Sequence, residues 1–173
     1  MRVAFLGGSF DPPHAGHIAI CEYLLQDPSF NEVMIIPVWE HAFDKPLTPF
    51  EHRWNMCQLA FDSFGSRVKI SDIEKKLGGK SFTLQTLRAL KKEFPTAEWV
   101  IALGEDAAQD LPKWHDYEAL KQEADCQIFP RGKKSPIPDI SSSELRKILQ
   151  KKEMTSSLIP KAVMEYIREH HLY

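Results

Sequence analysis

The sequence predicts one α/β domain built on a doubly wound parallel sheet. Short apolar runs alternate with segments of helical periodicity, which is the pattern of consecutive strand–helix–strand units. The chain has 173 residues, the size of one ordinary domain, and neither a repeat nor a low-complexity linker divides it. We therefore expect residues 1–173 to form a single domain.

Apolar runs mark the expected strands. The first, Val3–Leu6, is continuously apolar rather than alternating, as expected of a strand that is buried on both faces. The other expected strands are Val33–Val38, Val68–Ile70, Trp99–Leu103 and Cys126–Phe129.

Helical spacing of apolar residues separates these strands. The expected helices cover residues 18–25, 50–64 and 81–94, and two more open at Ser141 and Pro160. Ser141 and Glu144 have the spacing of a capping box, and proline suits the first position of a helix. We expect the helices from about residue 141 to pack on the sheet.

Composition excludes several classes of protein. There are 22 Lys and Arg against 24 Asp and Glu, a net charge of −2, which argues against a nucleic-acid partner bound through a broad basic surface. Since no apolar run approaches the roughly 18 residues of a membrane span, we expect no membrane partner. The three cysteines are far apart and form no C-x-x-C pair, so we expect a reducing, cytoplasmic location.

Three strand ends are candidates for the ligand site, because ligands of doubly wound sheets bind at the carboxyl ends of the strands. These ends are residues 7–17, 37–45 and 104–114. The first is rich in glycine and proline and carries His14 and His17 around the start of a helix, where free N–H groups already favour an anion. These features predict a clamp for phosphate.

Other interpretations of the histidine pair are a ligand-free pair in the core or on the surface, and a zinc site. The zinc site lacks the glutamate of H-E-x-x-H and a nearby cysteine. Two other phosphate motifs fail. Glu74 stands where a Walker A loop needs its first glycine, and the segment from Gly7 does not continue as G-x-G-x-x-G.

The segment Gly7–His17, GGSFDPPHAGH, resembles the signature of the nucleotidyltransferase superfamily with the (H/T)-x-G-H motif. Ile140–Arg146, ISSSELR, resembles the second motif of that superfamily. Ser81–Leu87, Gly104–Trp114 and the tail Leu158–Tyr173 are similar to segments of nicotinate-nucleotide adenylyltransferases. The resemblance covers nearly the whole chain and implies a Rossmann-like nucleotidyltransferase fold.

This resemblance implies a reaction in NAD biosynthesis. ATP and nicotinate mononucleotide would give the deamido-NAD dinucleotide and pyrophosphate by direct in-line attack, without a covalent intermediate. Mg²⁺ would arrive with ATP as the cofactor, and the protein would provide no metal ligands of its own. A homo-oligomer is compatible with the sequence.

The resemblance also assigns roles to the matched residues. The catalytic residues would be His14, His17 and Arg146. The ATP-binding residues would be Gly7, Gly8, Ser9, Phe10, Gly104, Asp106, Ser141, Ser142 and Ser143. The mononucleotide-binding residues would be Lys45, Thr83, Trp114 and His115. Taken singly, these residues have simpler interpretations: a helix cap for the serines, a surface charge for Lys45 and core packing for Trp114.

Departures from the family pattern leave the identity of the base open. Phe82 and His115 stand where tyrosine is common, and Glu105 stands where a small residue is usual. The loop His41–Lys45 resembles the H-x-F-x-K loop of nicotinamide mononucleotide enzymes. The alternative acceptors are therefore nicotinamide mononucleotide or another small phosphorylated molecule such as phosphopantetheine. Two alternative classes of protein are also open: a non-catalytic nucleotide-binding module and a His-based metal hydrolase.

Overall fold

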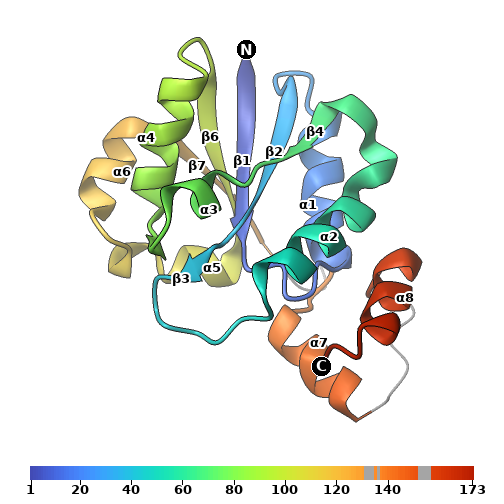
Figure 1. Ribbon diagram of the computed structural model, residues 1–173. Helices are drawn as coiled ribbons and strands as arrows, with labels where there is room; N and C mark the ends of the chain where they lie inside the picture. The colour runs from blue at the N-terminus through green and yellow to red at the C-terminus, as the bar shows by residue number, and fades with distance from the viewer. Residues whose placement is uncertain (131–134, 136, 152–156) are drawn as a thin grey trace.

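The computed structural model describes residues 1–130, 135, 137–151 and 157–173. Its centre is a five-stranded parallel sheet (Figure 1). In spatial order the strands are β4 (Val68–Ile70), β2 (Glu32–Pro37), β1 (Arg2–Gly8), β6 (Glu98–Gly104) and β7 (Asp125–Phe129). The chain leaves β1 in one direction through β2 and β4 and returns to its other side with β6, so the predicted doubly wound sheet is confirmed.

Helices cover both faces of this sheet (Figure 1). One face is covered by α1 (Ala15–Gln26) and α2 (Phe50–Phe61). The other is covered by α3 (Ile73–Leu77), α4 (Thr83–Glu93) and α6 (Tyr117–Glu123). The remaining helical elements are η1 (Asp62–Arg67), α5 (Glu105–Gln109), η2 (Leu111–Lys113), α7 (Ser142–Gln150) and α8 (Lys161–Glu169).

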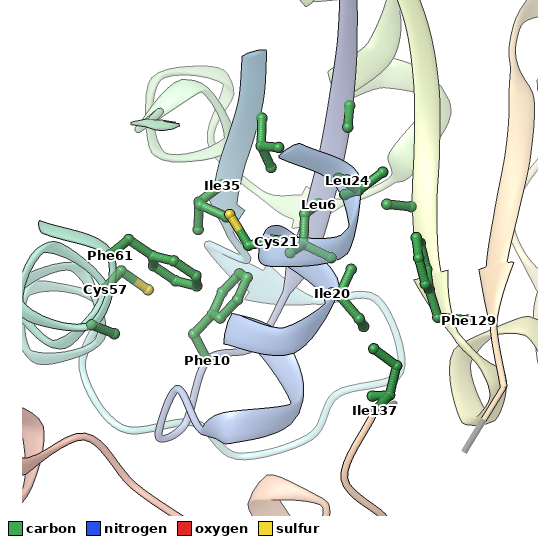
Figure 2. Close-up of a cluster of buried hydrophobic side chains, with 14 of the residues drawn as sticks. Leu6, Phe10, Ile20, Cys21, Leu24, Ile35, Cys57, Phe61, Phe129 and Ile137 are labelled. Carbon is green, nitrogen blue, oxygen red and sulfur yellow. The ribbon is translucent and has the colours of Figure 1, made fainter. Parts of the chain in front are cut away.

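The continuous apolar character of the strands follows from this two-sided cover. In β1, Ala4 and Leu6 face the cluster under α1 and α2, whereas Val3 and Phe5 face the cluster under α4 and α6. Figure 2 shows the first cluster, with Leu6 beside Cys21 and Leu24 of α1 and with Phe10 beside Phe61 of α2. Because successive side chains of a strand point to opposite faces, burial on both sides requires an apolar residue at every position.

The structure confirms the predicted strands and the long helices and adds short elements that the sequence analysis missed. The helix expected to reach Phe64 ends at Phe61, and Phe64 lies in the 3₁₀ turn η1. The loop 39–49 contains β3 (Glu40–His41), which pairs with β5 (Lys80–Ser81) in a separate two-stranded sheet. The missed elements are two-residue strands and helices of at most seven residues, which carry neither a continuous apolar run nor two full turns of helical period.

The C-terminal helices extend the core beyond the sheet. α8 packs on α2, and both Leu145 of α7 and Val163 of α8 are fully buried in the cluster that contains Leu6. α8 therefore joins the domain through α2, and the bounds of the domain stay a prediction.

All three cysteines are free thiols. Burial raises the pKa of Cys21 to about 12, so this thiol stays protonated and packs as a small apolar side chain (Figure 2). Within the described residues, no helix has the length and apolar character needed to cross a membrane.

The buried stripe of α4 gives a test of the second cluster. Leu87→Ala removes a side chain that is 0% exposed and is expected to lower the free energy of unfolding by about 2–5 kcal/mol, because it leaves a cavity. Leu59→Ala, at a position of α2 that is 40% exposed, is the control and should change it by less than about 0.5 kcal/mol. Urea unfolding measures both, and equal losses would contradict the packing described.

Candidate functional site

The carboxyl ends of β1 and β6 meet where the strand order reverses. The register pairs Leu6 with Ala102, so Gly8 and Gly104 come two residues later on neighbouring strands. A Cβ on Gly7 would lie 2.8 Å from the Phe5 ring, and one on Gly8 would lie 3.3 Å from the Phe10 ring. Glycine is therefore required at Gly7, and the bare backbone of both residues faces the crevice in which doubly wound sheets bind ligands.

The bend that follows β1 ends in a reciprocal cap on α1 made by the two predicted catalytic histidines. Nδ1 of His14 accepts the N–H of Gly16 at 3.1 Å, and Nδ1 of His17 accepts the N–H of His14 at 3.2 Å. The two ring centroids lie 3.8 Å apart. Because each Nδ1 is an acceptor, each neutral ring carries its proton on Nε2.

The two histidines differ in exposure. His14 is 1% exposed and His17 is half-buried. A Cβ on Gly16 would lie 3.0 Å from the His14 ring, so this glycine makes room for the cap. Any contact of His14 with a phosphate has to be made by Nε2, because its Nδ1 is committed to the helix.

Phe10 supports the histidines from within the core. It is 0% exposed, and its ring lies 4.7 Å from the His17 ring and 6.2 Å from the Phe61 ring (Figure 2). Its φ of 47° turns the backbone so that the side chain enters the core and the bend continues outside. The buried Phe10 side chain does not reach the site, so the predicted contact of Phe10 with ATP would have to be made by its backbone.

The second motif contacts the first. The Ser142 hydroxyl donates to the Pro12 carbonyl at 2.9 Å across 130 residues of sequence. Nη1 of Arg146 donates to the Asp11 carbonyl at 2.6 Å, and Nη2 donates to the Ser143 hydroxyl at 3.3 Å. The N-terminal turn of α7 therefore lies against the bend after β1.

Ser141 forms the predicted capping box with Glu144. The Ser141 hydroxyl accepts the Glu144 N–H at 3.2 Å, and the Glu144 carboxylate accepts the Ser141 N–H at 2.8 Å. The Ser141 hydroxyl thus serves the helix, whereas the N–H groups of Ser142 and Ser143 belong to the first turn, which has no acceptors within α7. This turn can donate to an anion.

A pocket of about 420 Å³ opens beside the bend. It is lined by Gly7, Gly8 and Ser9 of the first motif and by the whole predicted mononucleotide set: Lys45, Thr83, Trp114 and His115. These residues come from four separate segments of the chain. The structure therefore brings together the residues that were predicted to bind the second substrate, next to those predicted to bind ATP.

Aromatic rings and a helix end also line this pocket. Trp114 is half-buried against the second cluster, and the His115 and Phe82 rings lie 4.5 Å apart. Thr83 opens α4, and among the described residues no side chain caps this helix. Its first N–H groups are available to a ligand, and the helix dipole favours a negative charge there.

Two of the residues that line the pocket are lysines. Lys45 and Lys113 both line it, and Lys113 pairs with Asp110 at 2.8 Å. Burial lowers the pKa of His41 on the same wall, and the neighbouring Lys45 and Arg53 lower it further. His41 is therefore a neutral group beside charged lysines.

Two buried charged residues near the pocket escaped the sequence analysis. Arg53, 1% exposed, donates to the carbonyls of Thr48 at 2.7 Å, Ser9 at 3.0 Å and Trp39 at 3.4 Å. It lies on the inward face of α2, and a charge on an apolar stripe was the signal that could have found it. Glu74 accepts the Trp39 N–H at 3.2 Å, and burial raises its pKa.

The last predicted ATP residues lie at the end of β6. Gly104 is the N-cap of α5, and Asp106 is exposed in the first turn of that helix, so Asp106 is not the N-cap residue. Over the described residues there is no group of three or more His, Cys, Asp or Glu side chains arranged to hold a metal ion.

Comparison with known proteins agrees with the resemblance that the two motifs carry. Residues 5–148 match the model of the cytidylyltransferase-like family. A probable nicotinate-nucleotide adenylyltransferase of Myxococcus xanthus is 34% identical over 100% of this chain and 95% of its own length. Another from Oceanobacillus iheyensis is 36% identical over 99% of this chain and 96% of its own.

Solved structures share the fold. Nicotinic acid mononucleotide adenylyltransferase of Plasmodium falciparum, complexed with NaAD, superposes with a TM-score of 0.84 at 24% identity, over 99% of this chain and 97% of that one. The same enzyme complexed with APC gives a TM-score of 0.80 at 22% identity, over 99% and 96%. With two signature segments in contact and relatives aligned end to end, this chain is a nucleotidyltransferase that belongs to the nicotinate-nucleotide adenylyltransferase family, within the cytidylyltransferase-like proteins.

Proposed function

We propose that the protein transfers the adenylyl group of ATP to nicotinate mononucleotide, forming the deamido-NAD dinucleotide and releasing pyrophosphate. The observation that carries this proposal is the contact between the bend after β1 and the first turn of α7, next to a pocket lined by Lys45, Lys113 and aromatic rings. A triphosphate needs donors from several directions, and a pyridine nucleotide needs an aromatic face beside a phosphate site.

This reaction requires accurate positioning of the two substrates more than it requires a general base. A phosphate oxygen of the mononucleotide, ionised at neutral pH, attacks the α-phosphorus of ATP, and the bond from that phosphorus to the bridging oxygen of the leaving pyrophosphate breaks. The protein has to hold two mutually repelling anions in line and to stabilise charge that grows on the leaving group.

The residues of the bend suit that task. The Nε2–H tautomer set by the cap makes His14 and His17 donors to phosphate oxygens without a change in protonation. The first N–H groups of α7 and the Arg146 guanidinium approach the same place from the other side. In this proposal His14, His17 and Arg146 stabilise the transition state, and Ser142 and Ser143 bind the triphosphate.

Mg²⁺ fits this site as an ion that enters on the triphosphate. Two nearby oxygen-bearing groups that could bind a metal ion already form hydrogen bonds. The Ser142 hydroxyl donates to the Pro12 carbonyl, and the Asp11 carboxylate accepts the Thr48 N–H at 3.1 Å. The described residues thus present hydroxyls and cations rather than a set of open carboxylates. When bound, Mg²⁺ would neutralise charge on the phosphate oxygens.

The uncapped start of α4 favours nicotinate over nicotinamide. A carboxylate on the pyridine ring would accept the N–H groups at Thr83 and gain from the helix dipole, whereas a neutral carboxamide gains less and brings its own donors. Trp114 would stack on the pyridine, and Lys45 would bind the 5′-phosphate.

The direct test offers the protein ATP and Mg²⁺ with nicotinate mononucleotide or nicotinamide mononucleotide and measures pyrophosphate release. We expect the nicotinate substrate to react with the higher kcat/KM, because its carboxylate meets the N-terminus of α4. His17→Ala, which removes one donor, should reduce kcat by about 10²–10³. Equal rates for His17→Ala and the unaltered protein would refute the proposed role, and a preference for the amide would refute the choice of base.

Two substitutions at His14 separate its cap from its contact with phosphate. Asn supplies an oxygen that can replace Nδ1 as the cap acceptor, whereas Ala does not, so His14→Asn should be more stable than His14→Ala by about 1 kcal/mol in urea unfolding. Both lack Nε2–H, so both should lose activity to a similar degree. Wild-type activity in His14→Asn would show that His14 serves only the helix.

We expect Trp114 to bind the mononucleotide and not ATP. Trp114→Leu keeps an apolar side chain against the second cluster but removes the stacking face, so KM for the mononucleotide should rise about 10-fold while KM for ATP changes less than about twofold. Steady-state kinetics with each substrate varied in turn measures both. A rise in KM for ATP alone would contradict the assigned subsite.

A further inference from the structure

Asp11, at the centre of the bend, is a buried carboxylate with partners from three distant segments. It is 1% exposed. Its Oδ1 accepts the Tyr173 hydroxyl across 162 residues of sequence, and its Oδ2 accepts the Thr48 N–H at 3.1 Å. Nη1 of Arg146 lies 3.7 Å from the same Oδ2 while it donates to the Asp11 main-chain carbonyl at 2.6 Å.

Arg146 therefore lies between two competing anions. On one side is the Asp11 carboxylate, and on the other is the space where the proposed triphosphate binds. A guanidinium forms its strongest pair with a carboxylate through two parallel hydrogen bonds, but here the distance to the Asp11 side chain is longer than a hydrogen bond. The Tyr173 hydroxyl and the Thr48 N–H each bind one oxygen of Asp11 and together fix the orientation of its carboxylate at this distance from Arg146.

We infer that the Tyr173 hydroxyl is a positioning group for ATP: by donating to Asp11 it holds the carboxylate apart from Arg146 and leaves the guanidinium to the triphosphate. This inference rests on the proposed role of Arg146 in binding ATP. Tyr173 does not itself touch substrate in this account, and its effect passes through Arg146.

The surroundings of the Tyr173 phenol keep its hydroxyl protonated, so that it remains a hydrogen-bond donor. Burial raises the pKa of Tyr173, and the neighbouring Asp11 carboxylate raises it further. The hydroxyl is therefore neutral and able to donate at any pH at which the enzyme would work. A lysine or arginine at this place would also bind Asp11, but its charge would repel Arg146.

The chain offers a matched control on the helix that precedes Tyr173. The Tyr166 hydroxyl of α8 lies 3.0 Å from Nδ1 of His52 and accepts from Nδ2 of Asn55 at 3.0 Å, both on α2. Tyr166→Phe removes the same atom from the same end of the molecule and weakens the docking of α8 without touching Asp11. It reports what loss of a phenol in this region does to stability alone.

The experiment compares Tyr173→Phe with Tyr166→Phe. We expect Tyr173→Phe to raise KM for ATP, and Kd for a non-hydrolysable ATP analogue, by about 10-fold, because Asp11 closes on Arg146. KM for the mononucleotide should change less than about twofold. Tyr166→Phe should lower Tm but leave both KM values within about twofold.

A double substitution decides whether the effect passes through Arg146. In an Arg146→Met background there is no guanidinium to compete for, so Tyr173→Phe should leave Kd for the analogue unchanged. A 10-fold loss that persists in that background would overturn the inference, as would a Tyr173→Phe protein that matches Tyr166→Phe in Tm and in KM for ATP. Absence of pyrophosphate from either mononucleotide with the unaltered protein would overturn the proposed function instead, and the analogue titrations would still test Tyr173.

Discussion

The contact between the bend after β1 and the first turn of α7 organises the candidate site. Two consecutive carbonyls of the bend, those of Asp11 and Pro12, accept hydrogen bonds from Arg146 and Ser142. With these carbonyls turned toward α7, the histidine side chains and the helix N–H groups can approach one anion from two directions. The sheet provides the platform for this contact, because it ends β1 at the point where strand order reverses.

Buried polar groups hold the loops around this contact in place. Arg53 donates to carbonyls of the three segments that follow β1, β2 and the short β3, and Glu74 accepts the N–H of Trp39 from the opposite side. A buried charge is costly unless it is hydrogen-bonded, so these residues bind their loops in one arrangement. The result is a pocket lined by both charged groups and aromatic rings.

The sequence predicted the layers of the fold well, because every strand of the sheet that is buried on both faces has to be apolar throughout and the long helices carry a clear stripe. It also indicated segments, with glycine, proline and histidine at fixed spacing, whose residues lie together in the structure, and the roles of these residues stay predictions. It did not predict Arg53, Glu74 or the contact of Tyr173 with Asp11. Arg53 binds main-chain carbonyls 5 to 44 residues away, Glu74 meets Thr86 across 12 residues, and Tyr173 meets Asp11 across 162. The charge on the apolar stripe of α2 marks Arg53, but no local pattern reveals any of these partners.

The central claim is that the cap on α1 presents two imidazole Nε2–H groups to a triphosphate. Long-range ¹H–¹⁵N NMR of the histidine side chains tests it most directly. The account predicts unprotonated Nδ1 and protonated Nε2 in both His14 and His17, with shifts of both Nε2–H signals when a non-hydrolysable ATP analogue and Mg²⁺ are added. Protonated Nδ1 atoms, or Nε2–H signals that stay unchanged at saturating analogue, would contradict it.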